Sequence, residues 1–301
     1  SPEHHRGKLA WKKVISDVDD TLTCSGGSWP AGMDASYPRK SVYPGVLAFY
    51  RELDLGFHAD HDESWDRTKH VGNLVFLSAR PHVYKDVSEV QSYSKFRDLQ
   101  EKRGLHTSPT LLAGSLAAGR QFMVGGEIEP VAEKKYSNLK EYLSLYPEYS
   151  CLYIGDNGQG DVRAAEMLLN GDIVPAPGRK DNNSDEMNQG ETHSHDEIRN
   201  EHQIERCYIH QVQPLANTHT LHTETRTYAS EKFCYFTTYV DAAIDAYEHH
   251  FISTRGLKNV RAEAVRDVHC SGMADWQAAE ARSFRGEVRG SSHSAAARSR
   301  W

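Results

Sequence analysis

The sequence predicts an α/β protein built on a doubly wound parallel sheet. Short apolar runs at residues 14–15, 74–77 and 151–154 are each followed along the chain by a segment with helical patterning. A continuous apolar run is typical of a strand covered on both faces, and strands that alternate with helices form parallel sheets. Ligands of such folds bind beyond the carboxyl ends of the strands, so functional residues are expected there.

Each expected element rests on its apolar periodicity and on the Gly, Pro and polar residues that interrupt it. The expected strands are residues 14–18, 74–77, 110–112, 151–154 and 207–212. The expected helices are residues 45–56, 83–103, 135–147, 161–170, 237–252 and a shorter one at 257–268. Polar segments predict loops at 57–70 and 214–230, and a loop or small flap at 24–43.

Composition predicts one domain with loose ends. Residues 1–10 are polar and are expected to form a loose N-terminal segment before a single domain at 11–270. Within that domain, residues 175–205 contain hardly any apolar residue. This predicts a disordered acidic insertion, because such a segment has little surface to bury. Residues 271–301, rich in Ala, Ser, Arg and Gly, predict a disordered basic tail.

Charge and cysteine content narrow the function classes. The chain has a formal net charge of −7, which argues against general nucleic-acid binding because that requires a basic surface. It contains no apolar run of the roughly 18 residues that a membrane helix needs. The five cysteines lack metal-binding spacing, so free thiols in an intracellular, cytoplasmic protein are expected. The chain begins with Ser rather than Met, so the lack of a targeting signal carries little weight.

The most informative residues follow the first expected strand. Asp17 and Asp19 are two positions apart, and side chains two apart on a strand point the same way. Two converging carboxylates repel each other unless a cation or a shared proton offsets the repulsion. One of them could bind Mg²⁺ and attack a phosphorus atom while the other transfers protons. The alternative is a turn rich in Asp and Thr after a strand.

A second candidate lies directly after the strand at 74–77. Ser78 places a small hydroxyl at a strand end, where it can donate a hydrogen bond to a phosphoryl oxygen. The same residue would also suit an ordinary turn between a strand and a helix.

A third candidate is a lysine at the start of the helix expected at 135–147. Lys135 shares one helical face with Leu139, Tyr142 and Leu143, and this face must pack inward, whereas Lys134 is rotated away from it. A buried ammonium there could neutralise both an attacking aspartate and a phosphate. The spacing alone is equally compatible with a solvated pair of lysines.

The fourth candidate is the segment 155–161, Gly-Asp-Asn-Gly-Gln-Gly-Asp, after the strand at 151–154. Its glycines allow a sharp turn between a strand and a helix. The turn would present Asp156 and Asp161 as hard oxygen ligands for Mg²⁺. Alternatively, the segment is a glycine-rich connector in which Asp161 caps the next helix.

Taken in chain order, these four motifs resemble those of the haloacid-dehalogenase-like (HAD) phosphohydrolases over residues 14–170. The resemblance implies a HAD-like, Rossmann-like fold with small cap inserts, and a Mg²⁺-dependent phosphatase mechanism. It also implies a role for each residue. The implied roles are Asp17 as nucleophile, Asp19 as acid and base, Lys135 as the motif lysine, Thr21, Ser78 and Arg80 as substrate-binding residues, and Asp17, Asp19, Asp156 and Asp161 as the metal site.

A narrower resemblance joins the chain to one lipid-phosphatase branch of that superfamily. Residues 17–21 and 154–159 resemble the catalytic domain of the actin-patch type of yeast phosphatidate phosphatase. Residues 78–80 and 105–116 resemble the lipin catalytic domain. The segments between the motifs are short, so the site should be open to a bulky substrate such as a lipid head group or a protein.

We therefore expect a phosphatase that hydrolyses a phosphomonoester through an aspartyl-phosphate intermediate, with phosphatidate at a membrane surface as the candidate substrate. The basic tail would favour peripheral association with an anionic membrane. Two alternatives stay open. A non-catalytic, lipin-like module would bind acidic lipid without turnover, which the presence of both aspartates opposes. A HAD phosphotransferase would pass the phosphoryl group to an acceptor other than water.

Overall fold

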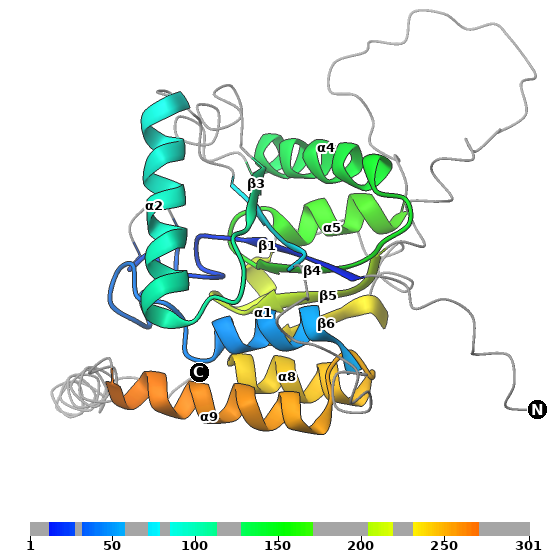
Figure 1. Ribbon diagram of the computed structural model, residues 1–301. Helices are drawn as coiled ribbons and strands as arrows, with labels where there is room; N and C mark the ends of the chain where they lie inside the picture. The colour runs from blue at the N-terminus through cyan, green and yellow to red at the C-terminus, as the bar shows by residue number, and fades with distance from the viewer. Residues whose placement is uncertain are drawn as a thin grey trace, which may run out of the picture.

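Six parallel strands form the sheet at the centre of the molecule, in the order β3-β2-β1-β4-β5-β6 (Figure 1). The computed structural model describes residues 12–27, 32–57, 72–78, 85–112, 128–170, 204–218 and 231–270. The strands are β1 (Lys12–Asp17), β2 (Leu74–Leu77), β3 (Thr110–Leu112), β4 (Ser150–Asp156), β5 (Ile204–His210) and β6 (Phe233–Phe236). The helices are α1 (Val46–Leu55), α2 (Lys85–Arg103), α4 (Glu129–Leu145), α5 (Asp161–Asn170), α8 (Tyr239–Glu248) and α9 (Thr254–Cys270), with a 3-10 turn at Leu215–Asn217. The predicted α/β fold with a doubly wound parallel sheet is confirmed.

The order of the strands reverses between β1 and β4. β1 pairs with β2 on one side and with β4 on the other. At such a point the connections leave in opposite directions and open a crevice at the carboxyl ends of the strands. Asp17 is the last residue of β1 and Asp156 the last of β4, so the first and fourth motifs flank this crevice.

Helices cover both faces of the sheet. In the view of Figure 1, α4 and α5 lie above the sheet, and α1, α8 and α9 lie below it. Side chains of a strand alternate between these faces: Val14 and Ile154 belong to the apolar cluster below, and Ile15 and Tyr153 to the cluster above. All four are fully buried. The two apolar layers therefore hold the strand ends, and the residues beyond them, in fixed positions.

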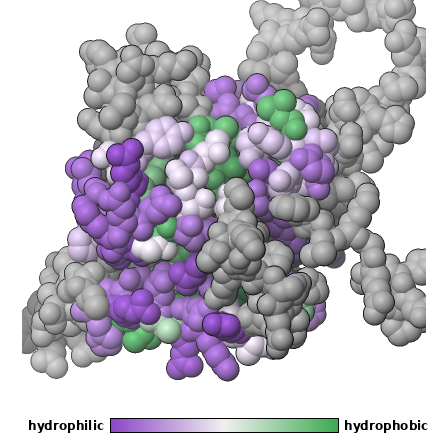
Figure 2. Space-filling view, viewed as in Figure 1, coloured by the Kyte–Doolittle hydropathy of each residue, from purple (hydrophilic) through white to green (hydrophobic). Residues whose placement is uncertain are grey.

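Helix α2 packs at one side of the sheet with only part of its surface. Phe96 and Leu99 are buried in the lower apolar cluster. The outer surface of α2 is hydrophilic, as the left side of Figure 2 shows. α2 is therefore attached to the sheet by a few apolar side chains, and most of its described surface is polar.

Two carboxylates of helix α9 cap the N-terminus of α1. α1 has no acidic residue in its first turn and no side-chain cap. Instead, Asp267 accepts a hydrogen bond from the Gly45 N–H at 3.0 Å, and Glu263 accepts one from the Ala48 N–H at 2.7 Å. Carboxylates at the start of a helix interact favourably with its dipole. Gly45 has a φ of 81°, and a Cβ there would lie 2.9 Å from the Ala264 Cβ, so the close contact requires glycine.

Two strands correct the sequence-based expectation. β6 is missing from the predicted elements, because its four residues, Phe-Cys-Tyr-Phe, directly precede a helix and show no clear alternation. β5 begins at Ile204, inside the segment predicted to be disordered, so that boundary was also wrong. Both strands extend the sheet on the side of β4.

Helix boundaries differ as well. α4 begins at Glu129 instead of residue 135, with Pro130 in its first turn, where a missing N–H costs nothing. The helix predicted at 237–252 spans only Tyr239–Glu248. The following helix, predicted to be shorter, is in fact longer, because Thr254–Cys270 packs along α1 and α8.

Several predictions fall on residues that the structure does not describe. These are the N-terminal segment at 1–10, most of the loop at 57–70, the insertion up to residue 203 and the tail at 271–301. The domain boundaries therefore stay predictions. Among the described helices, none is long and apolar enough to cross a membrane.

The burial pattern of β6 predicts different effects for two adjacent aromatic residues. Phe236 is 2% exposed and stacks on His210, whereas Tyr235 is 36% exposed. We expect Phe236→Ala to lower the free energy of unfolding by about 3–5 kcal/mol, because it empties a core site. Tyr235→Ala should lower it by less than about 1 kcal/mol. Urea denaturation followed by circular dichroism measures both, and equal losses would contradict the burial of Phe236 against β5.

Candidate active site

The ends of β1 and β4 bring three carboxylates and one ammonium together. Asp17, Asp156 and Asp161 each offer a carboxylate oxygen, and these oxygens lie within 4.8 Å of one another. Lys135 Nζ lies 3.1 Å from Asp17 Oδ1 and 2.6 Å from Asp161 Oδ1. Each of the four residues is at most 3% exposed. Three of the four sequence motifs therefore meet at one buried point.

Lys135 reaches this point because it lies on the buried face of α4. Leu139 and Leu143 share that face, whereas Lys134 is only half-buried. Burial by itself would lower the pKa of Lys135, but Asp161, Asp17 and Asp156 outweigh burial and raise the pKa above its ordinary value. Lys135 is therefore a permanent ammonium at this site.

Asp161 is already engaged by hydrogen bonds. Its Oδ1 accepts from Lys135 and from the Tyr153 hydroxyl at 2.5 Å, and its Oδ2 accepts from the Asp156 N–H at 3.4 Å. Gly155 makes this possible, since a Cβ there would lie 2.5 Å from the Asp161 Cβ. Asp161 therefore has less capacity left for a cation than its two neighbours.

Asp17 and Asp156 each keep one oxygen without a partner. Asp17 Oδ2 and Asp156 Oδ2 are buried, and neither has a hydrogen-bond partner among the described residues. The other oxygen of Asp156 accepts from the Gly158 N–H at 2.6 Å. A buried carboxylate oxygen without a partner is unfavourable. Mg²⁺ prefers carboxylate oxygens, so the residues present fit the predicted metal.

The pKa shifts of Asp17 and Asp156 also favour a bound cation at this point. Burial raises the pKa of Asp17 to about 8; Lys135 opposes this shift, and Asp161 and Asp19 add to it. Burial, followed by the charges of Asp161 and Asp17, likewise raises the pKa of Asp156. Without added positive charge, the two groups therefore tend to hold protons near neutral pH.

The loop after β1 carries the remaining residues of the first motif. Asp19 is half-buried and forms an isolated β-bridge with Thr23. Thr21 is fully buried, and its Oγ1 has no hydrogen-bond partner among the described residues. A hydroxyl in this position is free to donate to a bound group.

Asp20, between these two, has a structural role that the sequence analysis missed. Its Oδ1 accepts from the Ser25 N–H at 2.8 Å. Its Oδ2 accepts from the N–H groups of Met33 and Asp34 at 2.5 and 3.0 Å. Asp20 thereby fixes the loop predicted at 24–43 to the first motif. Two adjacent aspartates, Asp19 and Asp20, give no signal for which of them turns inward.

Ser78 lies at the neighbouring strand end. It follows Leu77, which is the register partner of Asp17 in the pairing of β1 with β2. Its N–H donates to the Leu112 carbonyl at 3.0 Å, which fixes its backbone to β3. Arg80 lies outside the described residues.

Asn157 joins the fourth motif to the loop after β5. Its Oδ1 accepts from the N–H groups of Val212 and Gln213 at 2.9 and 3.1 Å. Its Nδ2 donates to the Gln213 carbonyl at 2.8 Å and to Thr218 Oγ1 at 3.0 Å. Asn157 therefore holds the turn that carries Asp156. Sequence reasoning missed it, since the only signal is its place next to Asp156.

Comparison with known proteins agrees with this geometry. Residues 12–170 match the family model of the phosphatidate phosphatase APP1 catalytic domain. No curated protein and no solved structure gives a significant match to the chain. The matched residues span β1 to α5 and include the whole carboxylate and lysine cluster. The resemblance drawn from the four motifs is confirmed.

The raised pKa values predict how metal-free stability depends on pH. Between the ordinary aspartate pKa of 3.8 and about 8, folded Asp17 keeps a proton that the unfolded chain releases. Stability without metal should therefore fall as the pH rises from about 5 to about 8. Asp156→Asn removes one repelling carboxylate and should flatten this fall. Melting temperatures in EDTA across this range measure the effect.

The exposed Asp98 of α2 provides the matched control, because Asp98→Asn should leave the pH dependence unchanged. Added Mg²⁺ should raise the melting temperature of the unaltered chain more at the higher pH, and it should do little to Asp156→Asn. Identical pH profiles for all three chains would contradict the electrostatic account.

Proposed function

Because the chain belongs to the family of the phosphatidate phosphatase APP1 catalytic domain, we propose that it hydrolyses the phosphomonoester of phosphatidate with Mg²⁺ and an aspartyl-phosphate intermediate. The observation that carries this proposal is the pair of buried oxygens, Asp17 Oδ2 and Asp156 Oδ2, beside the Lys135 ammonium. Phosphoryl transfer needs such a combination of an anionic nucleophile, a cation site and a fixed positive charge.

In this proposal Asp17 and Asp156 would hold the metal through those two oxygens, and the Asp19 carbonyl and Asp161 would be its further ligands. The bound Mg²⁺ would supply positive charge that lowers the pKa of both carboxyl groups and offsets the charge on the phosphoryl oxygens. Asp17 must be ionised to act as a nucleophile, and its pKa of about 8 without a cation gives a physical reason for a metal requirement.

The proposed reaction has two steps. Asp17 attacks phosphorus in line and forms an O–P bond while the bond to the lipid oxygen breaks, and Asp19 gives that oxygen a proton. Asp19 then takes a proton from a water that attacks the aspartyl-phosphate, which releases phosphate and restores Asp17. Lys135 and the hydroxyls of Thr21 and Ser78 donate to the phosphoryl oxygens throughout.

Tyr153 and Asn157 would hold catalytic residues in position. The Tyr153 hydroxyl and Lys135 both donate to Asp161 Oδ1, so Asp161 keeps the ammonium turned towards Asp17. Asn157 keeps the turn with Asp156 in place through the loop after β5. Neither Tyr153 nor Asn157 needs to touch the substrate for this role.

Replacement of the nucleophile tests the mechanism. We expect Asp17→Asn to reduce phosphate release from p-nitrophenyl phosphate by at least roughly a thousandfold. Its melting temperature without metal should stay equal or rise, because the change removes repulsion and no apolar contact. Asp98→Asn on the exposed side of α2 serves as the matched control and should retain full activity. Ordinary turnover by a folded Asp17→Asn chain would exclude Asp17 as the nucleophile.

Comparison of substrates tests the proposed activity itself. We expect kcat/KM for phosphatidate in mixed micelles to exceed that for glycerol 3-phosphate by at least about tenfold, since the lipid part adds binding energy. EDTA should abolish both activities. Phosphoryl transfer to an added alcohol in place of phosphate release would indicate a phosphotransferase. Binding of phosphatidate without any turnover would indicate a non-catalytic lipid module.

A further inference from the structure

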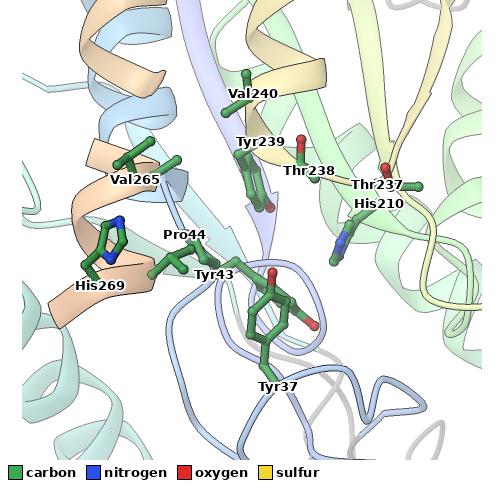
Figure 3. A pocket seen from close by; sticks show the side chains of 12 residues that line it. Tyr37, Tyr43, Pro44, His210, Thr237, Thr238, Tyr239, Val240, Val265 and His269 are labelled. Carbon is green, nitrogen blue, oxygen red and sulfur yellow. The ribbon is translucent and has the colours of Figure 1, made fainter. Parts of the chain in front are cut away.

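Figure 3 shows a cavity of about 290 Å³. It lies at the carboxyl ends of β5 and β6, because His210 ends β5 and Thr237 follows β6. α9 contributes Val265 and His269 to one side, and the segment from Thr237 to Val240 contributes the other. Tyr43 and Pro44, ahead of α1, lie between them. His210, the last residue of β5, also lines the cavity. Most of the lining is aliphatic or aromatic.

Four hydroxyl groups of the lining are already hydrogen-bonded within the protein. The hydroxyls of Thr237 and Thr238 donate to Asp241 Oδ2 at 3.1 and 2.8 Å. The Tyr43 hydroxyl donates to the Asp34 carboxylate. An occupant with its own donors and acceptors, such as a peptide backbone, would lose its water contacts and find few replacements. Away from the exposed His269, the cavity therefore suits an occupant without polar groups.

Two lining residues also hold the loop that follows the proposed nucleophile. His210 Nδ1 donates to the Asp20 carbonyl at 2.7 Å, and the Tyr239 hydroxyl donates to the Thr21 carbonyl at 2.7 Å. Only one layer of side chains therefore separates the cavity from the first motif. Asp156 ends β4 and Thr237 follows β6, two strand spacings or roughly 10 Å away along the sheet. The glycerol part of a lipid and the first carbons of its acyl chain have about this length, and they would pass around His210 and Tyr239.

We propose that this cavity binds part of one acyl chain of the lipid substrate while the phosphate group lies at the carboxylate cluster. This inference rests on the proposed lipid phosphatase activity. A cavity of about 150 Å³ holds benzene, so the present volume accommodates roughly ten to twelve carbon atoms of a chain. Val265, which is 53% exposed, leaves an apolar group at the rim where the chain would enter.

Binding of simple alkanols tests the cavity without catalysis. Calorimetric titration of the full chain with hexanol, octanol and decanol should show affinity that rises by about fourfold per methylene group. Val265→Trp should fill the rim and weaken decanol binding by at least about tenfold. Ile244→Trp on α8 is the matched control, because Ile244 is also exposed, at 43%, and does not line the cavity. Absent binding, no dependence on chain length, or equal loss in both variants would overturn the proposal.

A second measurement connects the cavity to the substrate. Val265→Trp should raise KM for didecanoyl phosphatidate and leave the turnover of p-nitrophenyl phosphate unchanged, whereas Ile244→Trp should change neither. An unchanged KM in Val265→Trp, with phosphatidate still hydrolysed, overturns the acyl-chain site and leaves the proposed function standing. Loss of decanol binding in Val265→Trp supports the cavity even if the unaltered chain fails to hydrolyse phosphatidate, so the two failures are distinguishable.

Discussion

Repulsion among buried carboxylates is the constraint on which the catalytic end of this molecule depends. Asp17, Asp156 and Asp161 surround a single ammonium that cannot neutralise all three. The neighbouring residues either donate hydrogen bonds to these carboxylates or hold the charged groups in position. Tyr153 donates to Asp161, Gly155 admits the Asp161 side chain, and α4 presents Lys135 on its buried face. The charge that is left unbalanced lies on two buried oxygens, Asp17 Oδ2 at the end of β1 and Asp156 Oδ2 at the end of β4. A divalent cation is the simplest group that resolves it.

The proposed reacting residues and the residues that hold them in place come from different parts of the chain. The proposed reacting residues lie within the matched region at 12–170, but several of their supports lie beyond it. His210 and Tyr239 hold the carbonyls of Asp20 and Thr21, and the loop after β5 is fixed to Asn157. The later strands and helices thus determine how rigid the first motif is. They also form most of the cavity next to it, so most of the proposed acyl-chain site lies outside the region that the family model matches.

The sequence was a good guide where a rule of spacing applies. A known period or turn type predicts the strand-end aspartates, the helical face with Lys135 and the glycine-rich turn. The structure brings these residues together. It was a poor guide where a residue acts through a distant partner. Periodicity pairs Asp17 with Asp19 and gives no role for Asp20, and Asn157 is recognised only once β5 is paired with β4. β6 was missed for a related reason, since four aromatic-rich residues become a strand only because β5 offers a free edge.

The order of the strands determines at which residue the protein can be truncated without exposing a strand edge. β5 pairs with β4 along most of its length, and β6 then covers β5, yet both come from beyond residue 204. A fragment cut at residue 170, where the family match ends, would leave β4 as a bare edge with unsatisfied N–H and C=O groups. It would also strip α8 and α9 from the underside of α1 and expose that apolar layer to solvent. Such a piece would tend to pair with other chains and precipitate. The sheet therefore extends beyond the residues of the family match, and expression boundaries are better chosen from the sheet than from that match.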